Sequence, residues 1–372
     1  MAQLSTTSKP TQSKPKPWHY HITIDLLFLI LANSIFHPWI TMVFYLCLAS
    51  VHKHREPLAY YTLCYTALLA VVEVCIWANH RLTYGPHRKV DWENEVIVIT
   101  GGGTGLGRVL SQMFLRKGAK VAVLDVREPD EEATEEMERW DLQWEVMDVS
   151  SKEQIEGAVG KVVDQFGSPT ILINNAATNV RGLPLFATPT KPTTLSAEQA
   201  SSTLTINALG HFNTLSVLLP YLITSKTGAH IVTVSSLLAH LAPASLSDYT
   251  ASKAAVSSLH HTLCNELRSH PDPSVFAKVK TLLVEPGQLD TQLFADKTTV
   301  PFYAHFFGPV VEAKDIAKEI VRRIERGDGG SIRLPFYAKF MPYFGVMPGT
   351  VQLMFRWFSG IDGAMLPVDK KA

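Results

Sequence analysis

The sequence predicts an α/β protein in which a doubly wound parallel sheet follows a hydrophobic N-terminal region. Short β-branched runs alternate with longer helical patterns after residue 94, a glycine-rich turn joins the first run to its helix, and apolar residues dominate 22–79. Strands and helices that alternate at this spacing form a parallel sheet with helices on both faces. The 372 residues allow one large α/β domain with an appendage.

The N-terminal part of the chain is predicted to be a tail followed by a membrane anchor. Residues 1–21 are polar and rich in proline and lysine, so we expect a flexible tail. The anchor region, 22–79, holds two apolar stretches, 22–50 and 58–78, on either side of the charged link HKHREP. These stretches fit either two membrane spans or a hairpin that enters one leaflet. Buried soluble helices and a cleaved signal peptide are the alternatives.

Two features interrupt the apolar stretches. His37-Pro38 breaks the first, and Glu73 lies inside the second. A carboxylate at a bilayer centre costs roughly 2.5–3.5 kcal/mol on insertion scales, which weakens the case for a clean second span.

The elements of the α/β domain follow one another from residue 94. The segment EVIVITGGGTGLGRVLSQMFLRKGAKVAVLDV reads as a strand, a glycine turn, an amphipathic helix and a second strand that ends at Asp125. Further strands are predicted at 144–149, 170–176, 230–236 and 279–286, and helices at 152–166, 196–223, 247–268 and 312–326. We therefore predict an α/β domain of the Rossmann type over 80–335 and an apolar C-terminal extension over 336–372.

Composition excludes several classes of function. Lysine plus arginine and aspartate plus glutamate both total 34, and no basic run carries interleaved aromatic residues, so a nucleic-acid partner is not expected. The four cysteines form no CxxC pair, and no histidine lies at metal-ligand spacing from acids or cysteines. We expect reduced thiols and no metal site.

The turn TGGGTGLG at 100–107 predicts a dinucleotide site of the Rossmann type. Gly101, Gly105 and Gly107 stand where a strand meets a helix, so the backbone can approach a pyrophosphate at the helix N-terminus. Asp125 ends the next strand and is placed to accept hydrogen bonds from the adenosine ribose. The 2′-phosphate of NADP(H) would be repelled by Asp125 and by the acids at 128–132, and only Arg127 is near to balance their charge. NAD(H) is therefore preferred, and NADP(H) stays possible through Arg127.

The stretch SDYTASKAA predicts a second chemical feature. Tyr249 and Lys253 are four residues apart, so they are neighbours on one face of a helix. A protonated lysine there would lower the pKa of the phenol toward neutrality. Two fixed positions alone do not identify a site.

Taken together, the motifs resemble the short-chain dehydrogenase/reductase family over residues 94–335. They are TGGGTGLG, Asp148-Val149, NNAA at 174–177, Asn207, Ser236 thirteen residues before Tyr249, YTASK and PGQLDT at 286–291. The family's NNAG reads NNAA here, and the Pro-containing stretch 182–194 is taken as a surface loop. INALGHFNTLSVLLPYL, YTASKAAVSSLHHTLCNEL and the hydrophobic N-terminus resemble the membrane-associated retinol and 17-beta-hydroxysteroid dehydrogenase subgroup.

The resemblance implies a catalytic set of Asn207, Ser236, Tyr249 and Lys253. Tyr249 is the general acid/base, Lys253 lowers its pKa and binds the nicotinamide ribose, Ser236 holds the substrate oxygen, and Asn207 orders a water relay. The implied cofactor contacts are Gly101, Gly105, Gly107, Asp125, Asp148, Val149, Asn175, Tyr249, Lys253, Pro286, Gly287 and Thr291. Purely structural roles remain open for Asn207, as a helix bend, and for Thr291, as a turn residue. Ser235 is expected to face away from the site.

We expect a membrane-associated oxidoreductase that transfers hydride between NAD(H) and a lipophilic alcohol or carbonyl, such as a retinoid, steroid or long-chain lipid. An NADPH-dependent ketone or aldehyde reductase and a non-catalytic lipid-surface scaffold are the alternatives. The aromatic segment 288–311 suits a lid over an apolar ligand. The apolar stretch 336–358 suits a membrane surface, a dimer contact or a core contact. Membrane lipid and a homodimer are the expected partners, on the cytosolic face of the endoplasmic reticulum or a lipid droplet.

Overall fold

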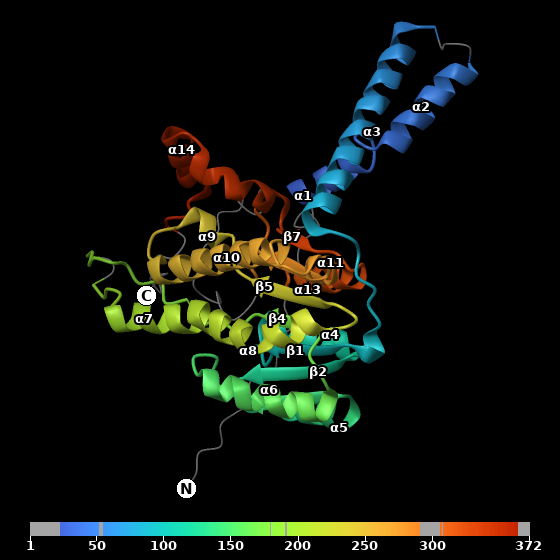
Figure 1. The fold of residues 1–372 in the computed structure, drawn as a ribbon. Coiled ribbons are helices and arrows are strands. Elements are labelled where there is room, and N and C mark those ends of the chain that lie inside the picture. Colours follow the sequence, from blue (N-terminus) through green and yellow to red (C-terminus); the bar gives the residue numbers. More distant parts are fainter. Residues whose placement is uncertain are drawn as a thin grey trace.

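Seven parallel strands form one sheet in the order β3-β2-β1-β4-β5-β6-β7 (Figure 1). The structure is a computed structural model that describes residues 23–51, 55–178, 180–189, 192–290, 306 and 308–363. The strands are β1 Val96–Thr100, β2 Lys120–Asp125, β3 Leu142–Val146, β4 Ile171–Asn174, β5 Ala229–Val234, β6 Val279–Val284 and β7 Gly330–Ile332. The chain order reverses between β1 and β4, and the carboxyl ends of such strands form the usual ligand crevice of a doubly wound sheet.

Helices cover both faces of the sheet because the strand residues are apolar on both sides. Ile97 and Ile99 face helices α4 Gly105–Leu115 and α13 Ala313–Glu325, which pack against each other. Val98, from the same strand, faces α6 Lys152–Phe166, α8 Gly210–Thr224 and α10 Ser247–Arg268. Buried runs of this kind are typical of parallel sheets. The predicted α/β fold is confirmed.

The largest differences from the predicted elements are in three places, and β4, β5 and β6 each end two residues before the predicted end. The predicted helix 196–223 is divided into α7 Ala197–Leu204, a π-helical turn η3 Thr205–Leu209, and α8. The strand predicted at 144–149 lies at Leu142–Val146. Strand β7 and helix α5 Glu131–Arg139 were not predicted, since β7 has three residues and α5 buries Ala133 alone. A strand of three residues is too short to show a period, and α5 is mostly charged, with Ala133 and Met137 as its apolar residues.

The apolar N-terminal region forms three helices, α1 Ile24–Ala32, α2 Pro38–Ser50 and α3 Pro57–Tyr84. The first apolar stretch is divided between α1 and α2, because a turn interrupts it before His37-Pro38. Helix α2 packs along α3, and this hairpin projects from the domain (Figure 1). Thr66 Oγ1 on α3 donates to Thr41 Oγ1 on α2 at 2.9 Å.

Helix α3 is the candidate membrane anchor. Its 28 residues are long and apolar enough to cross a bilayer, and only 6% of its most apolar window is buried. Among the described residues Ala197–Thr224 passes the same test, but 44% of its window is buried because it packs in the core. The domain end of α3 is fastened by Lys280, whose Nζ donates to the Tyr84 carbonyl at 2.9 Å.

The C-terminal extension folds back onto the domain as a 3₁₀ helix, η4 Phe336–Val346, followed by α14 Gly349–Ser359. Helix η4 packs on α9 Leu238–Leu241, which follows β5 closely. The buried cluster between them contains Leu237, Leu241, Ala338, Met341 and Phe344. Two more short helices in the described part of the chain are η2 Trp92–Asn94 and α11 Pro273–Lys278.

Candidate active site

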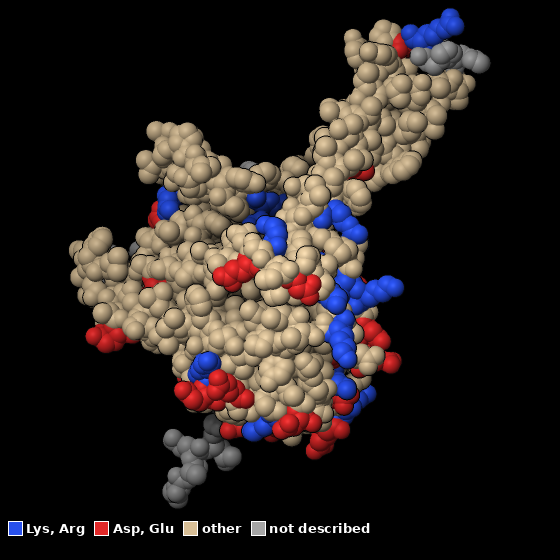
Figure 2. Space-filling view, in the orientation of Figure 1, with Lys and Arg blue, Asp and Glu red and all other residues tan. Residues whose placement is uncertain are grey.

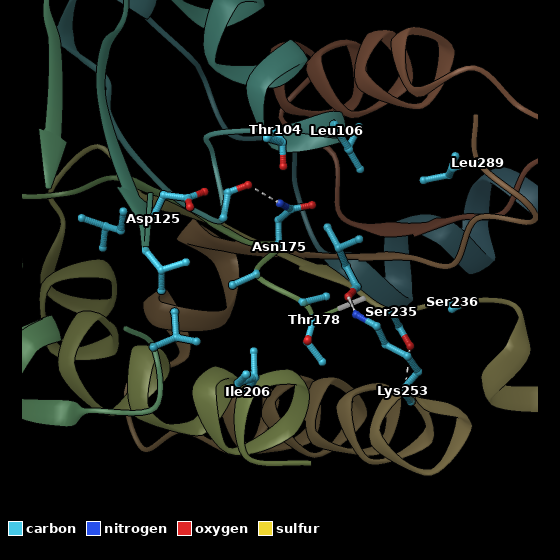
Figure 3. Close-up of a pocket in the computed structure, with 18 of the residues that line it drawn as sticks. Thr104, Leu106, Asp125, Asn175, Thr178, Ile206, Ser235, Ser236, Lys253 and Leu289 are labelled. Atoms are coloured by element: carbon cyan, nitrogen blue, oxygen red, sulfur yellow. Dashed lines mark hydrogen bonds between the residues drawn. The ribbon is translucent and has the colours of Figure 1, made fainter. Parts of the chain in front are cut away.

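A cleft of about 620 Å³ lies at the carboxyl ends of the strands. Asp125 and Thr104 lie toward one end, and Ser236 and Lys253 toward the other (Figure 3). Most of the predicted site residues line it: Gly101, Gly105, Asp125, Asp148, Val149, Asn175, Ser236, Tyr249, Lys253, Pro286 and Gly287. Gly107 and Asn207 lie behind its wall, and Thr291 lies outside the described residues. So does most of the predicted lid 288–311.

The glycine turn is too crowded for side chains. Gly101 has a φ of +64°, and a Cβ added there would lie 2.8 Å from the Ala176 Cα. A Cβ on Gly107 would lie 2.3 Å from the Gly101 carbonyl oxygen, so Gly107 allows α4 to pack closely behind the turn. Asn175 braces the turn, because its Nδ2 donates to the carbonyls of Thr100, at 3.2 Å, and Gly101, at 3.0 Å.

The Asp125 carboxylate is fixed at the end of β2. Its Oδ2 accepts from the Gly103 amide at 2.8 Å and its Oδ1 from the Arg127 amide at 3.1 Å. The residue is 8% exposed, whereas the Arg127 side chain is exposed at the edge of the cleft. A dinucleotide fits this end of the cleft, because a glycine turn, a helix N-terminus and a fixed acid lie together.

The middle and far parts of the cleft are formed by loops that follow the strands. Asp148 follows β3, and its Oδ1 accepts from the Ser150 amide at 2.8 Å. The Gly287 amide donates to the Leu334 carbonyl at 2.8 Å. A Cβ on Gly287 would lie 2.9 Å from the Pro335 Cδ and 3.1 Å from the Tyr337 hydroxyl. The C-terminal extension therefore supports this wall of the cleft.

Tyr249 and Lys253 lie on the first turns of α10, and both are buried. Burial raises the pKa of Tyr249 to about 12, although a hydrogen bond with Ser236 acts in the opposite direction. Burial lowers the pKa of Lys253 to about 8. The Lys253 Nζ donates to the Val234 carbonyl at 3.0 Å and lies 6.0 Å from the centre of the Tyr249 ring.

This electrostatic result differs from the expectation that Lys253 lowers the Tyr249 pKa. The two side chains are neighbours, but the Lys253 ammonium donates to the Val234 carbonyl, and burial removes the Tyr249 phenol from solvent. Removal of water disfavours the phenolate and the ammonium alike. In this structure desolvation is the largest cause of both pKa shifts.

The two consecutive serines after β5 have different partners. Ser235 Oγ donates to the Lys253 carbonyl at 2.8 Å and accepts from Ser257 Oγ at 2.8 Å, so it connects β5 to α10. Ser236 Oγ accepts from the Leu238 amide at 3.2 Å and is hydrogen-bonded to Tyr249. Ser236 is thus the serine that the structure brings together with the phenol.

Asn207 is fully buried in the π-helical turn η3. Its Oδ1 accepts from the Thr178 amide at 2.8 Å, and its Nδ2 donates to Ser252 Oγ on α10 at 3.1 Å. π-Helical turns often occur at functional sites. The side chain of Asn207 therefore joins the wall of the cleft to the helix that carries Tyr249 and Lys253.

Sequence reasoning missed several residues that line the cleft and one that lies behind it. The missed lining residues include Thr104, Leu106, Met147, Thr178 and Ile206. Ser235, which was expected to face away from the site, also lines the cleft (Figure 3). Behind the cleft, Glu285 is fully buried and contacts Arg333 at 2.7 Å, His240 at 2.9 Å and Ser257 at 2.9 Å. The sequence signal that could have identified Glu285 is its position, a charged residue between an apolar strand and Pro286-Gly287.

The ionisation of Glu285 is controlled by those partners. Burial by itself would raise the pKa of Glu285, but the hydrogen bond from His240 and the charge of Arg333 outweigh it and lower the pKa to about 2. Glu285 accordingly stays a carboxylate and connects β6, α9 and α10 beneath the cleft.

No group of three or more histidine, cysteine or acidic side chains within the described ranges is arranged to hold a metal ion. The four cysteines are free.

Comparisons with known proteins agree with this geometry. Residues 95–300 match the family model described as short chain dehydrogenase. Retinol dehydrogenase 10-B of Danio rerio is 30% identical over 331 residues, which is 81% of this chain and 94% of that protein. Human estradiol 17-beta-dehydrogenase 11 is 28% identical over 260 residues, 69% and 80% of the two chains.

The solved structures agree on the fold. A short chain dehydrogenase from Burkholderia cenocepacia in complex with NADP has a TM-score of 0.55 at 23% identity and covers 72% of this chain and 98% of its own. From the family match, this fold and these relatives, the chain belongs to the short-chain dehydrogenase/reductase family of oxidoreductases and is similar to its retinol and 17-beta-hydroxysteroid dehydrogenase subgroup.

Proposed function

We propose that this protein is a membrane-associated oxidoreductase that transfers hydride between NAD(H) and a lipophilic alcohol or carbonyl. The observation that supports this proposal most directly is the hydrogen bond between Tyr249 and Ser236 at one end of the cleft. The glycine turn and Asp125 lie at the other end. The names of the relatives support a retinoid or steroid as substrate, and a long-chain lipid has the same chemistry.

The side chains have distinct roles in this proposal. The bound dinucleotide supplies or accepts the hydride. Tyr249 exchanges a proton with the substrate oxygen, and its high pKa keeps the hydroxyl protonated at neutral pH, ready to donate. Ser236 hydrogen-bonds the same oxygen as charge develops on it. Lys253, with a pKa of about 8, passes protons to and from Tyr249 near neutral pH. Asn207 holds α10 and Thr178 in register and orders the water relay.

NAD(H) is the proposed cofactor because the Asp125 carboxylate is fixed where an adenosine 2′-phosphate would lie. Its two oxygens are held by backbone amides and little water surrounds it. An NADPH-dependent reductase is the second candidate. The exposed Arg127 at the edge of the cleft favours it, as does the NADP in the Burkholderia relative.

The hairpin of α2 and α3 is proposed as the membrane anchor. The 28 residues of α3 rise about 42 Å, of which the apolar run 58–78 supplies about 30 Å, the thickness of a bilayer core. Arg55 and Glu56 lie in the link between α2 and α3, and Figure 2 shows acidic and basic side chains at the tip of the hairpin. Charges at that end favour a hairpin that crosses the bilayer over one that stops within it. Glu73 lies nearer the domain end of the run, where a carboxylate is less costly.

The catalytic domain is proposed to lie on the cytosolic face of the endoplasmic reticulum, the location that suits a hairpin that crosses a bilayer. A lipid droplet, which is bounded by one leaflet, is the location that would go with a hairpin that enters one leaflet only. NAD(H) and four free cysteines suit a reducing compartment.

Tyr249→Phe tests the proposed chemistry, with Tyr221→Phe on α8 as the matched control. The assay follows NADH formation by detergent-solubilised protein with retinol, estradiol and a long-chain alcohol. Loss of the proton donor should lower kcat by about 10²–10⁴-fold with little change in cofactor affinity. Full activity of Tyr249→Phe, or no turnover of any alcohol or matching carbonyl by the wild type, would refute the proposal.

A further inference from the structure

The outward face of α14 is apolar along its length. Val351, Leu353, Met354 and Phe358 are 44–70% exposed and Trp357 is 84% exposed. Leu353, Met354, Trp357 and Phe358 repeat at three- and four-residue spacing, so they form one stripe. No residue of α14 is buried. Contiguous exposed apolar surface of this kind marks an interaction site in a soluble domain.

The polar atoms of α14 are directed inward. Within 349–359, all of which the structure describes, Arg356 is the one charged residue. Its guanidinium donates to the Leu241 carbonyl, forms an ion pair with Asp362 at 2.8 Å and lies over the Phe344 ring. Gln352 Nε2 donates to the Met347 carbonyl at 2.8 Å. Helix α14 therefore has an inner face fastened to the domain and an outer face without charge.

This apolar surface continues toward the N-terminal hairpin through η4. Phe340, Tyr343 and Val346 on η4 are 49–83% exposed. Helix α1 packs on η4, where Phe28 and Phe336 stack with ring centres 3.6 Å apart. Helix α14 and the hairpin lie on the same side of the molecule (Figure 1). Figure 2 shows few charges over both, whereas acidic and basic side chains gather mainly at the opposite end of the domain.

We propose that α14 and the exposed side chains of η4 form a second contact with the lipid bilayer, beside the hairpin. This inference rests on the membrane association in the proposed function. A lipid surface fits because the patch is apolar, carries Trp357 and Tyr343, residue types enriched at membrane interfaces, and continues into the candidate anchor. Two contacts fix the tilt of the domain. Because η4 also supports the wall of the cleft at Gly287, that wall is held against the membrane from which a lipophilic substrate comes.

Quenching by brominated lipid tests this contact in the full-length protein. The protein is reconstituted in phosphatidylcholine nanodiscs with plain or brominated acyl chains, and the loss of tryptophan fluorescence is compared among single variants. Trp357→Phe removes the reporter on α14. Trp77→Phe removes a reporter on α3, and Trp140→Phe removes a 40% exposed tryptophan at the end of α5, away from the proposed membrane side.

The expected result is that quenching falls in Trp357→Phe and in Trp77→Phe and stays at the wild-type level in Trp140→Phe. If only Trp77→Phe lowers quenching, the anchor is in the bilayer but α14 is not, and the inference fails while the membrane function stands. Acrylamide protection of Trp357 in that case would show that protein, and not lipid, covers it. If neither variant lowers quenching, neither α14 nor α3 is in the bilayer, and both the inference and the proposed α3 anchor fail. If quenching falls only in Trp357→Phe, the α14 contact is supported and the α3 anchor is rejected.

Discussion

Replacement of Asp125 by asparagine should remove the proposed selectivity for NAD(H). The variant keeps the size of the side chain and deletes the charge that a 2′-phosphate would meet. Two like unit charges about 5 Å apart repel by about 3 kcal/mol at an effective dielectric constant of about 20. That energy corresponds to about a hundredfold in Kd. The effective dielectric is low here because Asp125 is 8% exposed, and its oxygens are held by the Gly103 and Arg127 amides.

The assay is fluorescence titration of NADH and NADPH into wild type, Asp125→Asn, Arg127→Ala and the double variant. The measured quantity is the ratio of the two dissociation constants, because a general loosening of the glycine turn affects both cofactors alike. We expect the wild type to prefer NADH by tens-fold to about a hundredfold, and Asp125→Asn to bring the ratio near one. Arg127→Ala should strengthen the preference slightly, since an exposed charge contributes at most about 1 kcal/mol. A wild type that prefers NADPH would refute the reasoning and give Arg127 the leading role.

Two further predictions concern buried charges. Alcohol oxidation should accelerate as the pH rises through about 8, because burial lowers the pKa of Lys253 to about 8 and only the neutral amine accepts a proton from Tyr249. A kcat/KM profile checks this, and a profile flat from about pH 6 to about pH 10 would contradict it. Arg88→Met should destabilise the fold by about 3–5 kcal/mol, because it leaves the buried Glu95 without the Arg88 Nη2 group that donates to its two oxygens at 2.6 and 2.7 Å. Urea unfolding measures the loss. Lys152→Met, which breaks the exposed pair with Glu156, is the control and should change stability by less than about 1 kcal/mol.

The parallel α/β fold could be predicted because its strands are buried on both faces and leave long β-branched runs. Helices α6 and α10 begin and end at the predicted residues, since Ser151 caps the first and α10 is a long run without proline or glycine. The short strand β7 and the π-helical turn η3 could not be predicted. Their existence depends on neighbours, because three residues hold no period and a π turn is set by packing.

The candidate site was predictable to the extent that its residues follow strand ends in chain order. Glycines, Asp125, Ser236 and Tyr249 lie where the motif order puts them, because the carboxyl ends of parallel strands share one edge of the sheet. Glu285 and its partners come from β6, α9, α10 and the segment after β7, so no local pattern joins them. Long-range polar networks of this kind become visible only with tertiary structure.

The YxxxK spacing shows most clearly where sequence reasoning ends. Four-residue spacing on a helix dictates that Tyr249 and Lys253 are neighbours, and they are. It does not dictate the surrounding dielectric, which depends on how deeply α10 is covered. Both groups are buried, so each loses hydration and their neutral forms are favoured, opposite to the effect expected from proximity alone. A phenol that stays protonated and an amine that titrates near pH 8 still make a proton relay, one in which Lys253 sets the pH response and Tyr249 delivers the proton.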